Sequence, residues 1–433
     1  MHPPLSIDVL VCGGGMAGSV AAIAAARAGA DTLLVERYGF LGGSATAAAV
    51  GQFVGWQTAA GRQVVHGIAE ELVQRLVAVD AAIPHSRFTM STGHRMDRVQ
   101  YDPELLKCVL DDMVDEAGAR ILFHAMPIDV RKDGNTIGEV VLATKAGALR
   151  ILPKVVIDAS GDLEIAALAK ADFLGLESGE ALQPATMMFR YGPMNFERFD
   201  ALPADELAAL ASRGVEQKAL ARAALHCSRV PGSDEGWFNI SRVTVDTADP
   251  FSLSAAEVEG RRQAIAASHF LRDNVPGCEV GRIRAIAPQL GIRESRRIHG
   301  AYVLTVEDLH SQVPFADTIA VGAYPVDVHP AAGTHLRFET FGPDHAYSIP
   351  YRSLVPLSLT NVLVAGRGIS TTHDAHAATR VMPLVMAVGQ AAGQAAAMSA
   401  VSNVAVANVP IEKLRDALIR ADAYLGAYVP KLV

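Results

Sequence analysis

The sequence predicts an α/β fold: a Rossmann-type domain with a central parallel sheet, and an α+β domain inserted into it. Three observations lead to this fold class. Residues 7–35 contain a buried strand, a glycine-rich turn, a small-residue helix and a second buried strand. A buried strand followed by glycine returns at residues 361–366. Between these parts, from about residue 174, alternating polar strands are mixed with helices.

The first strand is predicted at residues 7–12, an apolar run (IDVLVC) typical of a strand that is buried on both faces. Small residues at 16–28 indicate a buried helix that ends at Gly29, and residues 32–35 (TLLV) predict the second strand. A strand–helix–strand unit of about 30 residues implies that its two strands are parallel.

A helix is predicted at residues 102–117, because Pro103 lies just inside its start. Residues 128–152 alternate between apolar and polar side chains around the Asp133-Gly134-Asn135 segment, which is typical of a hairpin. Residues 154–159 predict another buried strand.

The inserted region is predicted to hold both strands and helices. Its strands are expected at residues 186–191 and 237–245, and its helices at residues 203–226 and 254–274.

The chain then returns to the first domain through the strand at residues 361–366 and a long small-residue helix at 377–398. We therefore assign residues 1–173 and 350–433 to one discontinuous domain, and residues 174–349 to a substrate or cap domain.

Composition excludes several classes of protein. Of the 433 residues, 50% are hydrophobic and 19% are charged, which is typical of a globular chain. The net charge of −8 and the absence of a long basic run argue against nucleic-acid and anionic-membrane partners. Four scattered cysteines predict no metal site and fit a reducing cytoplasm. A signal peptide is not expected, because no basic region precedes an apolar run at the N-terminus. A membrane span is not expected either, because the apolar stretch at residues 16–30 is rich in alanine and glycine and contains Arg27.

A glycine motif after the first strand predicts a dinucleotide site. Gly13, Gly15 and Gly18 fit the G-x-G-x-x-G pattern in the strand-to-helix context that gives the pattern meaning. The first glycine makes a tight turn, and the second lets the backbone approach a pyrophosphate. The third allows close packing of helix and strand, while the helix N-terminus faces the phosphates.

Glu36, which follows the second strand, is predicted to accept hydrogen bonds from ribose hydroxyls and to repel a 2′-phosphate. The glycine motif does not distinguish NAD from FAD. Two distant segments favour FAD, namely the strand ending in Ala159, Ser160 and Gly161 and the strand-and-turn at residues 362–368. In FAD proteins of the glutathione-reductase type, similar strands return to the sheet and pass the cofactor.

The chain resembles FAD-dependent oxidoreductases related to the flavin subunits of fumarate reductase and heterodisulfide reductase. The stretches that carry the resemblance extend over nearly the whole chain, at residues 36–46, 291–298, 349–354, 365–370, 380–383 and 389–393.

The glycine motif and the resemblance together imply FAD as the cofactor. The residues expected to bind it are Gly13, Gly15, Met16, Ala17, Gly18, Glu36, Arg37, Gly42, Gly43, Ser44, Ala159, Ser160, Gly161, Gly366, Arg367, Met382 and Gly389.

The sequence also departs from related families. It has neither the cysteine cluster of the heterodisulfide reductase subunits nor the paired cysteines of disulfide reductases. A second G-x-G-x-x-G is absent, which argues against a separate NAD(P)H domain. The Gly-Asp step common in aromatic hydroxylases is replaced by Gly366-Arg367, which weakens a monooxygenase interpretation.

Five residues are candidates for the chemistry on the reacting side of the flavin. The resemblance puts the loop with His373 and His376 beside the flavin ring, where either histidine can act as base, acid or hydrogen-bond donor. His329 and Tyr351 are candidate substrate-side groups. Arg293 can grip a carboxylate, although an internal ion-pair network is the favoured interpretation of the arginine-rich stretch around it.

The function expected is that of an FAD-dependent dehydrogenase or oxidase, which takes a hydride from a small organic molecule. The hydride comes from a C–H bond next to oxygen or nitrogen, or from across a C–C pair. The electron acceptor is oxygen or another redox partner, and a homo-oligomer is left open. Two alternatives are a reductase or monooxygenase with an external electron donor, and an electron-transfer flavoprotein subunit.

Overall fold

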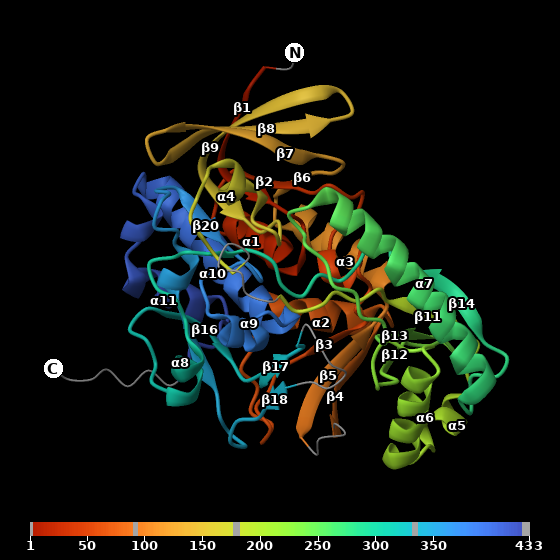
Figure 1. Cartoon of the computed structure of the whole chain (residues 1–433). Coiled ribbons are helices and arrows are strands. Elements are labelled where there is room, and N and C mark those ends of the chain that lie inside the picture. Colours follow the sequence, from red (N-terminus) through yellow and green to blue (C-terminus); the bar gives the residue numbers. More distant parts are fainter. Residues whose placement is uncertain (1–2, 90–93, 176–181, 331–336, 427–433) are drawn as a thin grey trace.

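The computed structural model describes residues 3–89, 94–175, 182–330 and 337–426. Its central sheet has the strand order β6-β2-β1-β9-β8-β7, and β20 also pairs with β9. Parallel pairing joins β1 to β2, β2 to β6, and β9 to both β1 and β20. The parallel strands are β1 (Leu5–Cys12), β2 (Thr32–Val35), β6 (Arg120–Leu122), β9 (Gly147–Asp158) and β20 (Val362–Val364). The predicted fold class is therefore confirmed, with segments from both chain ends in one sheet (Figure 1).

The predicted hairpin around residue 134 is also confirmed. Strands β7 (Met126–Asp133) and β8 (Thr136–Thr144) are antiparallel, and Gly134 makes the turn with a φ of 57°. The separate strand expected at residues 154–159 is the second half of the long strand β9. The first half of β9 pairs with β8, and its last residues pair with β20. The hairpin projects from one end of the molecule (Figure 1).

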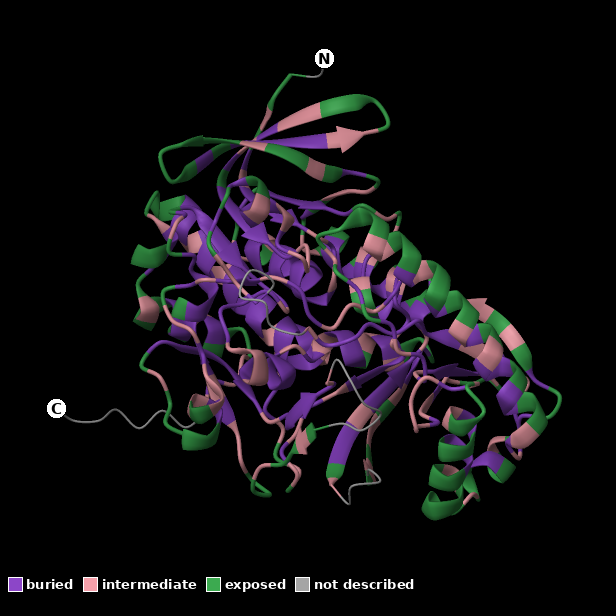
Figure 2. Cartoon of the chain, in the orientation of Figure 1, coloured by how far each residue is buried: buried purple, intermediate pink, exposed green. Residues whose placement is uncertain are grey.

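Two helices from opposite ends of the chain pack directly against each other. These are α1 (Met16–Arg27) and α10 (Met382–Ser402). A Cβ atom added at Gly389 would lie 2.3 Å from the carbonyl oxygen of Ala17, and one at Gly393 would lie 2.2 Å from that of Ala21. Helix α10 is long and apolar enough to cross a membrane, but 78% of its apolar window is buried inside the fold. Figure 2 shows this interior in purple.

The prediction of one helix at residues 377–398 is wrong, because the structure has two. Helix α9 (His373–Thr379) ends at Arg380, and α10 starts after Val381, whose backbone is extended with φ −69° and ψ 143°. Pro383 lies in the first turn of α10, where its missing N–H is tolerated. Arg380 lies at this break between the two helices, and its side chain is 14% exposed.

Other elements complete the large core. The predicted helix at residues 102–117 is confirmed as α3 (Pro103–Glu116), and the side chain of Asp102 caps it. Further helices are α2 (Ile68–Ala78), α4 (Glu164–Leu168), α8 (Val306–Ser311) and α11 (Ile411–Arg420), with short 3-10 turns at Gly43–Ala45, Tyr351–Leu354 and Val406–Asn408. Small sheets are formed by β3 (Gln52–Val54), β4 (Ala82–Thr89) and β5 (Arg95–Tyr101), by β10 (Phe173–Leu174) and β15 (Arg297–Ile298), by β16 (Thr318–Gly322) and β19 (Tyr347–Pro350), and by β17 (Val326–Val328) and β18 (Arg337–Glu339).

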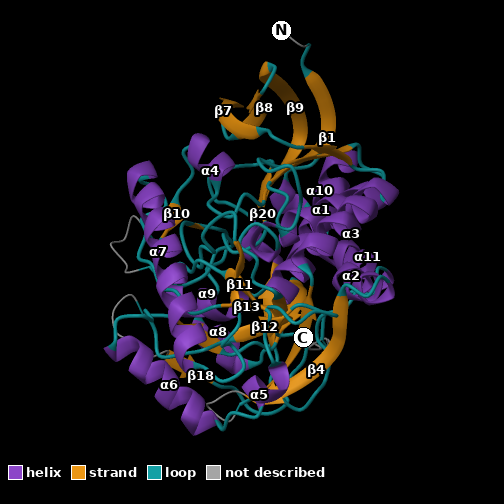
Figure 3. Ribbon diagram, turned by 90° about the vertical axis from the view of Figure 1, so that its right-hand side faces the viewer, coloured by secondary structure: helices purple, strands orange, loops and turns teal. Residues whose placement is uncertain are grey.

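A second unit lies beside this core and has buried clusters of its own. Its antiparallel sheet has the order β12-β13-β11-β14, and helices accompany it (Figures 1 and 3). The strands are β11 (Phe189–Gly192), β12 (Cys227–Arg229), β13 (Gly236–Phe238) and β14 (Arg282–Ile286), and the helices are α5 (Phe196–Asp200), α6 (Ala204–Glu216) and α7 (Pro250–Asn274).

Four predicted elements in this unit have bounds that need correction. The helix expected at 203–226 ends at Glu216, because Lys218 takes a left-handed φ of 57° and the next amides fold back to the carbonyl of Gly214. The strand expected at 237–245 leaves the sheet after Phe238, since the side chain of Gln263 binds the backbone of Arg242 instead. The strand expected at 186–191 is ordered as β11 only from Phe189, and α7 starts at Pro250 rather than 254.

The proposed division into residues 1–173 with 350–433 and residues 174–349 stays a prediction. Apolar side chains from Ile298 to Ile349 belong to the same buried cluster as β1 and α10. The independent buried clusters include residues from Ala185 to Leu290, together with Ala49. The region that packs separately from the main core is thus shorter than the predicted insertion.

Candidate functional site

The glycine turn between β1 and α1 is fixed by the protein's own packing at two of its three glycines. Gly13 has a φ of 98°, and a Cβ atom there would lie 2.4 Å from the carbonyl oxygen of Ala159. One at Gly18 would lie 1.8 Å from the carbonyl oxygen of Gly13. A Cβ atom added at Gly15 would have its nearest protein neighbour 3.9 Å away, on Gly43. Gly15 therefore borders open space at the N-terminus of α1, where a pyrophosphate binds in such folds.

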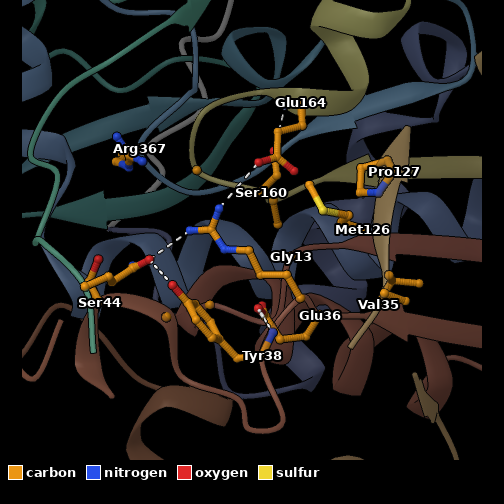
Figure 4. Close-up of a pocket in the computed structure, with 17 residues that line it drawn as sticks. Gly13, Val35, Glu36, Tyr38, Ser44, Met126, Pro127, Ser160, Glu164 and Arg367 are labelled. Carbon is orange, nitrogen blue, oxygen red and sulfur yellow. Dashed lines mark hydrogen bonds and ion pairs between the residues drawn. The ribbon is translucent and has the colours of Figure 1, made fainter. Parts of the chain in front are cut away.

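That space is a pocket at the carboxyl ends of the parallel strands. Figure 4 shows Glu36 and Tyr38 on one side of it and Ser160 and Glu164 on the other. Most of its lining comes from the ends of β1, β2, β9 and β20 and the segments that follow them; the start of β7 and the segment after β14 complete it. The lining consists of Gly13, Gly15, Val35, Glu36, Arg37, Tyr38, Gly43, Ser44, Ala125, Met126, Pro127, Ala159, Ser160, Gly161, Glu164, Gln289 and Arg367.

The carboxylate of Glu36 is held rigidly in the pocket wall. One oxygen accepts a hydrogen bond of 2.7 Å from the amide of Gly14, and the other accepts one of 2.9 Å from the amide of Tyr38. Glu36 is 7% exposed. A buried carboxylate oriented by two backbone amides beside the glycine turn is a suitable acceptor for ribose hydroxyls, as the sequence predicts.

Arg37 crosses the pocket toward Gln289 and Glu164. Its guanidinium donates a 2.9 Å hydrogen bond to Gln289 and lies 3.7 Å from the carboxylate of Glu164. Burial raises the pKa of Glu164 to about 7; Arg37 opposes this rise, and the negative charges of Asp158, Asp162 and Glu36 add to it. The pocket thus holds a carboxyl group that changes its charge near neutral pH.

Arg367 supplies a second cation from the turn after β20. It lies 2.6 Å from Asp162 and donates a 3.1 Å hydrogen bond to the hydroxyl of Ser295. Although burial opposes it, the charge of Arg367 and its hydrogen bond lower the pKa of Asp162. Arg367 therefore places a cation beside the pocket, at the position where aromatic hydroxylases commonly have the aspartate of a Gly-Asp step.

Most predicted cofactor residues meet at this pocket. Those in its lining are Gly13, Gly15, Glu36, Arg37, Gly43, Ser44, Ala159, Ser160, Gly161 and Arg367. Met16, Ala17 and Gly18 form the first turn of α1, and Gly42 bridges to Gly15. Gly366 faces Ala17 across the sheet edge, and Met382 starts α10.

Gly389 packs against the backbone of α1 rather than lining the pocket, so its small size serves helix packing. Sequence reasoning missed the lining residues Val35, Tyr38, Ala125, Met126, Pro127, Glu164 and Gln289. Tyr38 lies inside a stretch quoted for the resemblance, whereas Gln289 follows β14 and had no signal in the sequence.

A second polar cluster surrounds the loop and helix after residue 370. Glu294 is 1% exposed, and its Oε1 lies 2.9 Å from Nδ1 of His373. The same oxygen pairs with Arg297, whose Nε donates to the carbonyl of Thr371. Against the effect of burial, the hydrogen bond from His373 and the nearby charges lower the pKa of Glu294 to about 2. A histidine oriented by a buried carboxylate can act as a base.

His376 is 1% exposed, and its Nε2 lies 3.0 Å from the carbonyl oxygen of Arg293. Because that carbonyl accepts, Nε2 carries the hydrogen and Nδ1 is left as an acceptor. Nδ1 is buried and has no hydrogen-bond partner among the described residues. Burial is the largest cause that lowers the pKa of His376, to about 3, so the ring is neutral near pH 7.

His329 lies in the same region, on the strand side. Its Nε2 is 3.4 Å from Asp327, and its amide donates to the side chain of Gln183 at 3.1 Å. Arg380, at the break between α9 and α10, lies 3.9 Å from the Asp327 carboxylate. Burial and the charge of Arg293 lower the pKa of His329 to about 3, against the effect of Asp327.

The two remaining candidates, Arg293 and Tyr351, lie in different parts of the structure. Arg293 donates to the carbonyl of Pro184 at 2.6 Å and lies beside the cluster through its own carbonyl contact with His376. Tyr351 is 2% exposed, and its hydroxyl donates to the carbonyl of Val406 at 2.7 Å. The structure therefore gathers His373, His376, His329 and Arg293, while Tyr351 lies in the core.

Comparison with known proteins adds independent findings. A family model described as FAD dependent oxidoreductase matches residues 8–418. A crystal structure of a geranylgeranyl bacteriochlorophyll reductase-like protein from Thermoplasma acidophilum is similar to this chain, with a TM-score of 0.50 and 13% identity; the match covers 98% of this chain and 85% of that one. The structure of the flavin-dependent brominase Bmp2 also has a TM-score of 0.50, with 15% identity, and the match covers 95% and 83% of the two chains.

Proposed function

This chain belongs to the FAD dependent oxidoreductase family, and from that premise we propose that it is a dehydrogenase or oxidase of a small organic molecule. The chain binds FAD, and the pocket at the glycine turn fits its adenosine and pyrophosphate parts. When bound, FAD supplies the redox chemistry by accepting a hydride at its N5 atom. The relationship to the fumarate reductase and heterodisulfide reductase subunits, and a cytoplasmic location, are part of the proposal.

The observation that carries the proposal is the pair of His373 and Glu294. Removal of hydride from a carbon next to oxygen or nitrogen requires that the O–H or N–H proton also leaves. In this proposal Nε2 of His373 takes that proton, because Nδ1 is fixed by Glu294 at 2.9 Å. The buried carboxylate then stabilises the imidazolium, as the acidic member of a catalytic triad does.

His376 has a different role in the proposal. A ring that stays neutral and offers an unpartnered acceptor at Nδ1 is suited to bind an N–H or O–H group. It therefore orients a bound molecule and does not exchange a proton near pH 7. Its contact with the carbonyl of Arg293 ties this acceptor to the segment that also carries Glu294.

The test is anaerobic stopped-flow reduction of the FAD-loaded protein by a panel of small alcohols, amines and acids. A substrate should bleach the flavin without a partner protein. His373→Ala should keep FAD bound and slow the reduction roughly 100-fold or more, since a general base contributes about 100- to 10,000-fold. His269→Ala, at an exposed position on α7, is the matched control and should reduce at the parent rate.

Two results would contradict the proposal. If flavin reduction requires an external nicotinamide donor, and oxygen then modifies the substrate, the chain is a monooxygenase or reductase. If only a protein partner exchanges electrons with the flavin, it is an electron-transfer subunit. A parent-like rate in His373→Ala would move the proton transfer to another group of the cluster.

A further inference from the structure

One side chain of the second unit lies in the wall of the FAD pocket. The second unit, residues 185–290, has buried clusters that are separate from the main core. Among the residues that line the pocket, Gln289 comes from the segment after β14, and all the others lie outside residues 185–290. The pocket is therefore built from two parts of the chain that pack separately.

The side chain of Gln289 is bound to the two residues that follow Glu36. Its Oε1 accepts a 2.9 Å hydrogen bond from Nη2 of Arg37 and a second hydrogen bond from the hydroxyl of Tyr38. Figure 4 shows the bond from Tyr38 as a dashed line. Since Glu36 is the carboxylate suited to the ribose, the segment that serves the nucleotide also holds Gln289.

The backbone around Gln289 is fixed on both sides. The amide of Gln289 donates to the carbonyl of Ala47 at 3.1 Å. The amide of Leu290 donates to Oε1 of Glu257 on helix α7 at 2.8 Å, and the Leu290 side chain belongs to a buried cluster of the second unit. Gln289 therefore cannot shift without disturbing the packing of that unit.

Residues 43–51 make a second connection between the pocket and the second unit. Ser44 lines the pocket. Five positions later, Ala49 belongs to a buried cluster of the second unit. A Cβ atom added at Gly51 would lie 3.3 Å from the Cβ atom of Trp237. The same short segment thus borders the pocket at one end and enters the packing of the second unit at the other.

Arg37 is the group through which a bound nucleotide can act on Gln289. Its side chain is 41% exposed, and a hydrogen bond at such a site contributes little while water competes for it. A guanidinium has five N–H donors, so Arg37 can bind a phosphate oxygen and still donate to Gln289. A nucleotide in the pocket would fix the side chain and exclude water, which strengthens the contact with Gln289.

We propose that the nucleotide half of FAD stabilises the second unit through Gln289, so that FAD occupancy and the packing of residues 185–290 are linked. Linkage is reciprocal, and a well-packed second unit therefore raises the affinity for FAD by the same factor. Gln289 is a positioning residue, because it acts through Arg37 and Tyr38. The inference does not depend on which substrate is oxidised, and it predicts that ADP, without a flavin ring, is sufficient.

The experiment is hydrogen–deuterium exchange of the full-length FAD-free protein, alone, with saturating ADP and with saturating FAD. Either ligand should slow exchange in peptides from α7 and β14 at least about 5-fold, the lower end of ordinary coupling between sites. Gln289→Leu keeps the size of the side chain but removes the acceptor. It should lose this slowing while the glycine turn stays protected, and it should bind ADP more weakly by a similar factor.

Two further variants separate the acceptor from other effects of substitution. Gln289→Glu keeps oxygen acceptors for both donors and should retain the slowing at saturating ADP. Gln217→Leu, at an exposed position after helix α6 of the same unit, is the matched control and should respond to ADP as the parent does.

Four results would overturn the inference. The first is an absence of ADP binding, and the second is slowing of exchange in residues 185–290 by FAD but not by ADP. The third is parent-like slowing in Gln289→Leu. The fourth is a loss of slowing in Gln289→Glu as large as that in Gln289→Leu, since the acceptor oxygen would then not be the connection.

Discussion

At the residue scale, Gly15 is the position where a single side chain decides cofactor binding. A Cβ atom there meets no protein atom closer than 3.9 Å, so Gly15→Asp should fold normally but place a negative charge in the pyrophosphate space. We expect the purified variant to be colourless, with FAD content reduced at least about 10-fold through repulsion of the phosphates. Flavin absorbance after unfolding measures this, and full FAD occupancy would contradict the placement.

Glu164 gives FAD binding a pH dependence. Its pKa of about 7 in the folded chain lies above the ordinary value of 4.5. The protonated group therefore contributes its full stabilisation of the fold below about pH 4.5, and this contribution is lost as the pH rises through 7. The ionised form also repels a pyrophosphate. FAD affinity should therefore fall roughly 3- to 10-fold between about pH 6 and about pH 8.

Glu164→Gln should remove this dependence, and fluorescence titration of the apoprotein with FAD at several pH values measures it. The control is Glu412→Gln, an exposed position on α11. An unchanged pH profile in Glu164→Gln would assign the dependence to another group.

Local patterns predicted the residues of the glycine turn, but not the partners that the fold brings to them. Gly13 to Gly18, Glu36 and Arg37 are close in sequence, and their roles follow from one strand–turn–helix pattern. Glu294 meets His373 across 79 positions, and Arg380 meets Gln183 across 197. No local sequence pattern predicts contacts between residues so far apart in the chain. The sequence around Arg293 and Arg297 therefore did not indicate that these two arginines have different surroundings.

At the scale of elements, the contact between α1 and α10 predicts an unusual effect of alanine. In an exposed helix Gly→Ala stabilises by about 1 kcal/mol. At Gly393 the added Cβ atom would lie 2.2 Å from the carbonyl of Ala21, so Gly393→Ala should instead destabilise the fold by about 1–3 kcal/mol.

Chemical denaturation of the FAD-free protein measures the change. Val401→Ala, at a 72% exposed position of the same helix, should alter the free energy of unfolding by no more than about 0.5 kcal/mol. A stabilised Gly393→Ala variant would show that the two helices can separate without cost.

Element prediction succeeded where local signals were complete. The first strand–helix–strand unit, the turn at Gly134 and the capped helix α3 carry their own start and stop residues. It failed at the break before Pro383 and at the end of α6, where small apolar residues continue on both sides of the interruption. In β13 the strand stops because Gln263 of a distant helix binds the backbone of Arg242, which no local pattern contains.

At the scale of the whole molecule, the chain offers one glycine motif of the dinucleotide type. We therefore expect that the FAD-loaded protein shows neither tight, saturable binding of NADPH nor rapid reduction by it. Anaerobic titration followed by flavin absorbance measures both, with dithionite as the control for a reducible flavin. Rapid bleaching by NADPH would favour the externally driven reductase or monooxygenase.

The pairing of α1 with α10 has a consequence for the order in which the protein is made. A ribosome releases α1 long before residues 362–402, which supply β20 and the helix that covers it. The alanine- and glycine-rich face of α1 must therefore wait, exposed to water or to a chaperone, until almost the whole chain has emerged. Folding of the FAD site is then post-translational, and nascent chains that stop near residue 350 are substrates for proteolysis rather than for FAD loading.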